Sequence, residues 1–270
     1  MGLIAALIAT SLCAVMYVRM VRRELPEPLG KKKAMIPLGF GLLAIFLTLP
    51  MVILFGLLVQ ATVGSIPDAV SSLVLRSLIG SFLLAGFTEE FIKFLMLLPV
   101  LKIVKPRNVY EYGLLGAGVG LGFTALEELL YAGKSPMGAV FRILFFAMHL
   151  LFGLLMGTHL GLAKYSRREG RGDAGKHTFL AFFLPILWHT VFDASTTANA
   201  AVNATEESTQ IVGVVIALVV CAASIVLQFV LLTRFRKKTA EYCSMRLDGP
   251  AGEDGEAAAS PVSEEEIESE

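Results

Sequence analysis

The stretch "GFTEEFIKF", residues 86–94, constrains how this sequence can fold. Two adjacent glutamates and a lysine, Glu89, Glu90 and Lys93, interrupt a run that otherwise has the composition of a membrane helix. An ionised side chain near the centre of a bilayer costs on the order of ~2.5–3.5 kcal/mol. Residues of this kind are usually paired with one another or functional, so the rest of the chain is expected to bring partners to them.

The composition is that of an integral membrane protein. The 270 residues are 55% hydrophobic, with a mean hydropathy of +0.70, which exceeds what a soluble domain of this size needs. Seven apolar runs are long enough, or nearly so, to cross about 30 Å of hydrocarbon as helices. They are 2–18, 35–59, 71–101, 112–132, 139–163, 178–201 and 210–233. We predict an all-α polytopic bundle of about seven transmembrane helices in the cell membrane, with the third run tilted, or broken near Gly80 or Gly86.

Basic residues fall in alternate connections between the apolar runs. Six, three, five and four of them lie in four segments: 19–33, 102–107, 164–176 and 234–238. The intervening connections carry one basic residue in total: 60–68, 132–138 and 199–209. By the positive-inside rule the four basic segments are cytoplasmic. The N-terminus is therefore expected outside, with the first run an uncleaved anchor, and the C-terminus in the cytoplasm.

The C-terminal segment differs in character from the rest of the chain. Residues 241–270 hold ten acidic residues and one basic residue, although the net charge of the whole chain is zero. An acidic segment poor in aromatic residues is typical of a solvated, disordered tail. We therefore predict a membrane domain over residues 1–240 and a disordered acidic cytoplasmic tail over 241–270.

Glycines are frequent in the fourth apolar run. The pattern "GAGVGLG" (116–122) resembles a phosphate-binding loop only in its spacing, because no strand is predicted before it. Small residues on one membrane helix let a neighbouring backbone approach closely. We interpret the pattern as a helix-packing surface.

Polar residues occur at helical spacing in four of the apolar runs. In the third run Glu89 and Lys93 are four residues apart and can pair, whereas Glu90 lies about 100° round the helix and is expected to have no partner within it. The other three sets are Phe123 with Glu127 and Glu128, Arg142 with His149, and His189 with Asp193.

The depth of these residues in the membrane predicts that they meet. Counting from each cytoplasmic helix end at 1.5 Å per residue places the carboxylates and histidines roughly 16–22 Å deep. Four helices can therefore bring them together at one level. His159 and His177 lie much nearer the cytoplasmic face and are set aside.

Such a cluster supports more than one function. A buried carboxylate can act as general base and then general acid, and a histidine can orient water, stabilise an oxyanion or bind a metal. Glutamates with two histidines therefore suit the attack of water on an amide. The same residues could relay protons in a proton- or ion-coupled transporter, or lock helices together in an inactive scaffold.

The motifs "EEFIK", "GLGFTALEELLY", "FRILFFAMH" and "LWHTVFD" resemble, in this order, those of the PrsW family of intramembrane proteases. This family is related to CAAX prenyl proteases and bacteriocin-processing enzymes, and the resemblance covers about residues 35–235. It implies hydrolysis of a membrane-anchored protein, such as the anti-sigma factor that some relatives cleave, with no nucleic acid partner. Many members have Glu-Asn in the second motif, where this chain has Glu127–Glu128; the extra acid favours a divalent ion.

The resemblance, with the motif positions, gives a set of site residues. One of Glu89 and Glu90 is expected to activate water, Lys93 to pair with a carboxylate, and the histidines to hold water, the oxyanion or a metal. The catalytic candidates are Glu89, Glu90, Glu127, His149, His189 and Asp193, and the supporting candidates are Lys93, Phe123 and Arg142.

Metal dependence stays open at this stage. The zinc-protease spacing H-E-x-x-H is not in the sequence, yet histidines and glutamates on separate helices could form a tetrahedral zinc site with an open position. If zinc binds, we expect His149 and His189 with Glu90 or Glu127 as ligands. We favour water activation without a metal.

Overall fold

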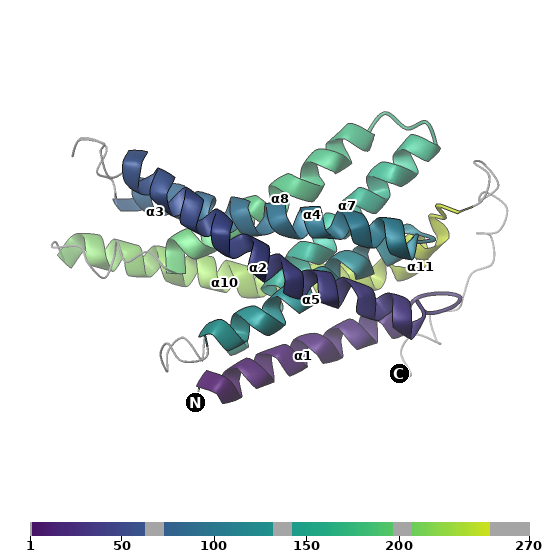
Figure 1. Ribbon diagram of the computed structural model, residues 1–270, viewed down its shortest axis with the longest axis horizontal. Helices are drawn as coiled ribbons and strands as arrows, with labels where there is room; N and C mark the ends of the chain where they lie inside the picture. The colour runs from purple at the N-terminus through teal and green to yellow at the C-terminus, as the bar shows by residue number, and fades with distance from the viewer. Residues whose placement is uncertain (1, 63–72, 132–141, 197–206, 249–270) are drawn as a thin grey trace.

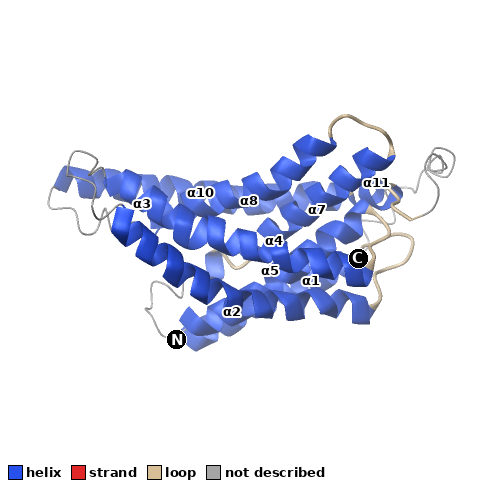
Figure 2. Cartoon of the chain, turned by 45° about the horizontal axis from the view of Figure 1, so that its top comes forward, coloured by secondary structure: helices blue, strands red, loops and turns tan. Residues whose placement is uncertain are grey.

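The computed structural model describes residues 2–62, 73–131, 142–196 and 207–248, and these form a bundle of long helices (Figures 1 and 2). The elements are α1 (Gly2–Arg22), α2 (Lys31–Thr62), α3 (Leu73–Ser81), the π-helical turn η2 (Phe82–Gly86), α4 (Phe87–Val104), α5 (Val109–Tyr131), α7 (Met148–Arg168), α8 (Ala174–Thr196), α10 (Glu207–Lys237) and α11 (Thr239–Ser244). Within these described ranges, β-structure is limited to one isolated bridge between Asn108 and Arg246. The predicted all-α class is confirmed.

Six helices within the described ranges are long and apolar enough to cross a membrane: Gly2–Arg22, Lys31–Leu58, Val109–Leu130, Arg142–Arg168, Ala174–Ser195 and Gly213–Lys237. The chain is thus a multi-pass membrane protein. The predicted third span corresponds to the continuous run α3–η2–α4, in which Glu89, Glu90, Lys93 and Lys102 lower the hydropathy. The total of seven crossings and the orientation in the membrane stay predictions.

The four basic segments meet at one end of the bundle, at the right of Figure 1, which we call the basic end. It comprises residues 23–30, 105–108, 169–173 and 238–248. The Tyr110 hydroxyl donates to the carbonyl of Met20 at 2.8 Å. The Arg168 guanidinium donates to the carbonyl of Arg246 at 2.6 Å, and the Val109 amide donates to the carbonyl of Met245 at 3.2 Å. The charge pattern predicted that the four segments lie on the same side of the membrane, and their position at one end of the bundle agrees with this.

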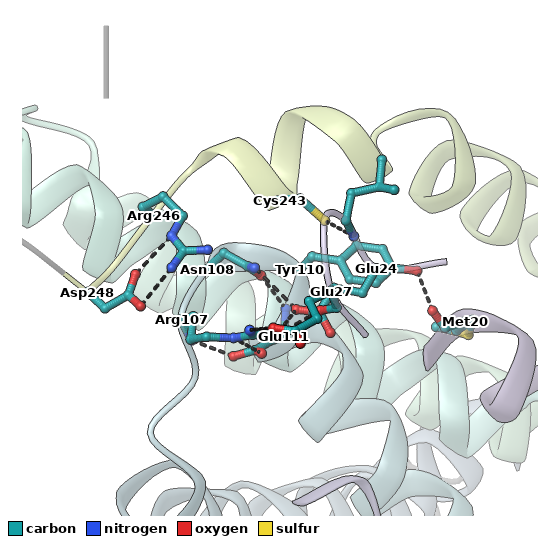
Figure 3. A network of polar contacts seen from close by, with 11 residues as sticks. Met20, Glu24, Glu27, Arg107, Asn108, Tyr110, Glu111, Cys243, Arg246 and Asp248 are labelled. Carbon is teal, nitrogen blue, oxygen red and sulfur yellow. Dashed lines mark hydrogen bonds and ion pairs between the residues drawn. The ribbon is translucent and has the colours of Figure 1, made fainter. Parts of the chain in front are cut away.

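The start of the predicted tail has structure. Residues 239–244 form α11, and Cys243 Sγ accepts a hydrogen bond from the amide of Leu25 at 3.4 Å (Figure 3). The amide of Leu247 donates to the carbonyl of Arg107 at 2.7 Å. Residues 241–248 therefore pack on the membrane domain, whereas 249–270 lie outside the described residues. The division into a membrane domain and a disordered tail stays a prediction.

Helix α5 runs through the middle of the bundle, held by backbone-to-backbone contacts with α7. A Cβ atom on Gly116 would meet the carbonyl of Gly153, and one on Gly153 would meet the carbonyl of Gly116. A Cβ on Gly120 would meet the carbonyl of His149. This close approach fixes the start of α7, and therefore His149, against α5.

The opposite face of α5 packs in the same way on α2. A Cβ on Gly122 would meet the carbonyl of Leu38, and one on Gly41 would meet the carbonyl of Val119. The interpretation of residues 116–122 as a helix-packing surface is confirmed. Because α5 has close backbone contacts on two faces, α2, α5 and α7 form one unit.

We expect Gly153→Ala to lower the melting temperature in detergent, because the added methyl group has to push α5 away and overpacking costs about 1–3 kcal/mol. Gly39→Ala on α2 is the matched control, since a Cβ there meets nothing within 4 Å. That substitution should leave the melting temperature unchanged or raise it, because alanine favours helix over glycine. Equal melting temperatures for the two variants would contradict the close contact.

A buried carboxylate lies in the centre of the basic end. Glu24 Oε1 accepts hydrogen bonds from Arg107 Nη2 at 3.1 Å and from Asn108 Nδ2 at 3.3 Å, as Figure 3 shows. Glu24 Oε2 is buried and has no hydrogen-bond partner among the described residues. Burial, together with the neighbouring carboxylate of Glu111, raises the pKa of Glu24 from 4.5 to about 7, although Arg107 acts in the opposite direction.

This raised pKa predicts a pH-dependent stability. Because the folded state keeps a proton that the unfolded chain loses near pH 4.5, the protein should be most stable at low pH and lose stability as the pH rises towards 7. The melting temperature in detergent should therefore fall between pH 5 and pH 7.5. Glu24→Gln should flatten this slope, and Glu27→Gln, at an exposed position, should retain it. An unchanged slope in Glu24→Gln would contradict the assignment.

Candidate active site

The paired glutamates follow directly on a π-helical turn. The amide of Phe87 donates to the carbonyl of Phe82, five residues earlier, and the hydroxyl of Thr88 donates to the carbonyl of Leu83. A π turn adds one residue to a helix and is common at functional sites. It changes the rotation of α4 relative to α3 and so sets the direction in which Glu89 and Glu90 point. In place of the predicted break near Gly80 or Gly86, the helix continues through this π turn, which ends at Gly86.

Gly86 lets this turn approach α8. A Cβ atom at Gly86 would meet the hydroxyl and amide of Thr190 and the carbonyl of Ile186. Since Thr190 follows His189, this contact brings the start of α4 beside the histidine of α8. The glycine that ends the π turn therefore determines how close Glu90 lies to His189.

Lys93 connects the two glutamates and one histidine. Its Nζ lies 2.9 Å from Glu90 Oε1, 3.3 Å from Glu89 Oε2 and 2.8 Å from His149 Nδ1. The expectation that Glu90 has no partner in its own helix is wrong, because residues three apart are also neighbours on a helix surface. The ammonium also lies 3.7 Å from the ring centroid of Phe123, a cation–π contact.

His149 of α7 contacts Lys93 of the third apolar run and Glu127 of the fourth. Since Lys93 donates to Nδ1, the proton of the neutral ring is on Nε2, which lies 2.7 Å from Glu127 Oε2. The ring of Phe123 contacts that of His149, with centroids 5.1 Å apart. In the F-x-x-x-E motif the phenylalanine thus contacts the lysine and the histidine, while the glutamate holds the histidine from the other side.

His189 is enclosed by acidic groups. Its Nδ1–H donates to Glu90 Oε1 at 2.8 Å. The other ring nitrogen, Nε2, lies 3.9 Å from Glu89 Oε2 and 3.7 Å from Asp193 Oδ2. Phe152 stacks on the ring, with centroids 5.3 Å apart. Nε2 therefore faces two carboxylates without contacting either directly.

Contrary to the prediction from their spacing, Arg142 and His149 do not share one helix face. Phe145–Ala147 form a turn between the helical residues 142–144 and α7, so the two residues are not on one continuous helix face. The guanidinium lies 3.0 Å from Glu128 Oε1 instead. The extra acid of the second motif is therefore in an ion pair beside the cluster.

The cluster is closed on one side and accessible on the other. The side chains of Glu90, Lys93 and His189 are almost fully buried, whereas those of Glu89, Glu127, His149 and Asp193 are partly exposed. Glu90 Oε2 has no hydrogen-bond partner among the described residues. A reactant can thus reach Glu89 and Asp193 more readily than Glu90.

Sequence reasoning overlooked two contributors. Phe152, which stacks on His189, lies three residues after His149, the spacing that places two residues on one helix face. Gly86 was considered only as a break, and its contact with α8 requires the three-dimensional arrangement.

Together, the bundle and its buried carboxylates and histidines define a class of protein: a polytopic membrane protein with a polar reaction centre inside the helices. The model of the family described as PrsW family intramembrane metalloprotease matches residues 32–224. The chain belongs to this family.

Curated relatives support the assignment. Protease PrsW of Halalkalibacterium halodurans is 32% identical over 120 residues, 43% of this chain and 54% of that protein. Protease PrsW of Bacillus subtilis is 36% identical over 121 residues, 44% of this chain and 54% of that protein. Protease PrsW of Clostridioides difficile is 27% identical over 163 residues, 57% of this chain and 64% of that protein. The chain spans roughly half to two thirds of the length of these relatives, and no solved structure matches it.

The family description includes a metal, and the donor atoms here suit one. Glu89, Glu90, His149 and His189 each offer a ligand atom, and these atoms lie within 4.8 Å of one another. Carboxylate oxygen and imidazole nitrogen are the donors found in catalytic zinc sites. The residues therefore fit zinc in kind, but the ammonium of Lys93 contacts three of the four. Its positive charge opposes a second cation among the same ligands.

We expect Lys93→Met to bind zinc more tightly than the wild-type chain, on the order of tenfold or more, because a repelling charge is removed. Zinc per protein is measured by mass spectrometry at a series of buffered free zinc concentrations. Lys102→Met, an exposed lysine of the same helix, is the matched control and should bind as the wild type does. Equal binding by all three proteins would show that Lys93 does not limit access of the metal.

Proposed function

We propose that this protein is an intramembrane endopeptidase that hydrolyses a peptide bond in a membrane-anchored protein. Family membership supports the reaction class. The observation that carries the proposal is the contrast between two adjacent glutamates. Glu90 is fully buried and bound by Lys93 and His189, whereas Glu89 is 15% exposed and has an oxygen facing His189 Nε2.

Glu89 is the general base in this proposal. It takes a proton from water, and the resulting hydroxide forms a bond to the scissile carbonyl carbon. Glu89 then gives that proton to the amide nitrogen as the carbon–nitrogen bond breaks, leaving a carboxyl group and an amine. Its accessibility and its single close partner, Lys93, leave an oxygen available for this exchange.

His189 stabilises the oxyanion of the tetrahedral intermediate. Its Nδ1–H is engaged by Glu90, which fixes the ring so that Nε2 points towards Glu89 and Asp193. When Nε2 carries a proton, it can donate to an oxygen that becomes negative beside Glu89. Asp193 Oδ2 lies 3.7 Å from Nε2, and Phe152 stacks on the ring.

Lys93, His149 and Glu127 support this arrangement. The ammonium compensates the charges of Glu89 and Glu90, without which burial of two adjacent carboxylates would be costly. Glu127 and Lys93 together fix the ring of His149. A zinc ion held by Glu89, Glu90, His149 and His189 would lower the pKa of a bound water and polarise the carbonyl group.

A membrane-anchored substrate follows from the position of the cluster. Glu89 lies near the middle of the continuous helical run from Leu73 to Val104, and the helices that carry the two histidines are apolar enough to span a bilayer. A segment that is itself embedded in the membrane can reach this depth without leaving an apolar environment. A membrane-anchored anti-sigma factor is one substrate of this kind.

We expect Glu89→Gln to lower cleavage at least 100-fold while the melting temperature stays within a few degrees, since a general base contributes about 10²–10⁴ in rate. The protein is reconstituted in liposomes with a panel of single-span membrane proteins labelled at both ends. The products are identified by mass spectrometry. Glu27→Gln, an exposed loop position, is the control for full activity.

Glu90→Gln distinguishes the role of Glu90 from that of Glu89. It should lower both cleavage and melting temperature, because it leaves Lys93 and His189 without their buried partner. Full cleavage by Glu89→Gln would overturn the assignment of the base. Absence of cleavage, with ion flux into the liposomes that Glu89→Gln abolishes, would instead support a transporter.

A further inference from the structure

A second pair of histidines lies outside the candidate active site. His159 on α7 and His177 on α8 approach each other next to residues 169–173 of the basic end, with their Nδ1 atoms 3.0 Å apart and their rings stacked. Both side chains are partly exposed. Neither histidine has a role in the proposed reaction.

A carboxylate orients one of these rings. Asp173 Oδ2 lies 3.6 Å from His177 Nε2, and Asp173 Oδ1 accepts a hydrogen bond from Ser166 at 2.5 Å. A carboxylate beside one ring nitrogen favours a proton there and leaves the lone pair on the other. In His177 that other nitrogen is Nδ1, which faces His159.

The separation of the two Nδ1 atoms suits a shared metal ion. Two nitrogens, each about 2.0–2.1 Å from one ion, lie roughly 2.9–3.4 Å apart for bond angles of about 90–109°. The observed 3.0 Å falls in this interval. An arrangement of carboxylate, histidine and metal, with the carboxylate on the far nitrogen, is a recurring one in metal sites.

We propose that His159 and His177 form a second metal site, which binds a divalent transition-metal ion that prefers imidazole, such as Ni²⁺, Cu²⁺ or Zn²⁺. Asp173 is a positioning residue for His177. Among the described residues this arrangement offers two ligands, and Lys176 adds a positive charge nearby, so we expect micromolar affinity. Water completes the coordination.

The site would join the two helices that carry the histidines of the candidate active site. His159 is ten residues from His149 along α7, about 15 Å, and His177 is twelve residues from His189 along α8, about 18 Å. A bound ion would therefore fix α7 and α8 relative to each other at the basic end. It would also contribute zinc to any analysis of the purified protein without taking part in hydrolysis.

The test titrates Ni²⁺ into the tag-free, full-length protein in detergent and measures stoichiometry and affinity by calorimetry. The parent carries His149→Ala and His189→Ala, so that the imidazoles of the active-site cluster cannot bind. We expect one equivalent of Ni²⁺ on this parent, and at least tenfold weaker binding once His177→Ala or His159→Ala is added. Asp173→Asn should weaken binding about tenfold.

Copper provides an independent readout. The electron paramagnetic resonance spectrum of one equivalent of Cu²⁺ on the parent should show coupling to nitrogen that His177→Ala reduces. Melting temperatures measured without metal identify any variant that is misfolded. If His159→Ala is misfolded, the Ni²⁺ affinity of His177→Ala alone tests the site. The proposal would be overturned if adding His177→Ala to the parent left the Ni²⁺ affinity unchanged. It would also be overturned if the wild-type chain bound Ni²⁺ and the parent, which keeps His159 and His177, did not. The readouts do not involve proteolysis, so the result is independent of the proposed function.

Discussion

The ammonium of Lys93 is the interaction on which the rest of the site depends. Two adjacent carboxylates in a membrane helix cannot both stay ionised unless a positive charge reaches both, and Lys93 lies within 3.3 Å of each. Its third contact, to His149, fixes which nitrogen of that ring carries the proton. Charge compensation and orientation of the histidine thus come from one side chain, whose own position is held by the ring of Phe123.

The helices are arranged so that this small cluster is held rigidly. Glycine contacts bring α5 close to α7 on one face and to α2 on the other, and the contact of Gly120 is with the carbonyl of His149 itself. Gly86 does the same between η2 and α8, next to His189. Small residues, which add no chemistry, therefore determine the distances between groups that do. Backbones in direct contact leave little freedom for the side chains of the site to move apart.

Much of this could be predicted because membrane burial imposes simple rules. Apolar runs gave the helices, basic residues grouped the connections that meet at one end, and helical spacing with depth indicated which polar residues meet. Pairings could not be predicted, because residues three and four apart are both neighbours on a helix, as Glu90 shows, and because Arg142 pairs with Glu128 of another helix. Apolar composition also selected the third run, 71–101, but it did not show the π turn within it or the contacts of its charged residues.

The π turn was also beyond sequence patterns, because no residue type in Phe82–Gly86 specifies it. It has a consequence for chain length. Each helical residue turns the chain by about 100°. Because the π turn absorbs one extra residue, loss of one residue between Ser81 and Phe87 would restore a regular helix with both glutamates still facing α8, whereas loss of a second residue would rotate them away by about 100°. A relative with the intact motif could thus lack the extra residue and keep its acids in place, but any further change in the length of this lead-in would direct them at another helix.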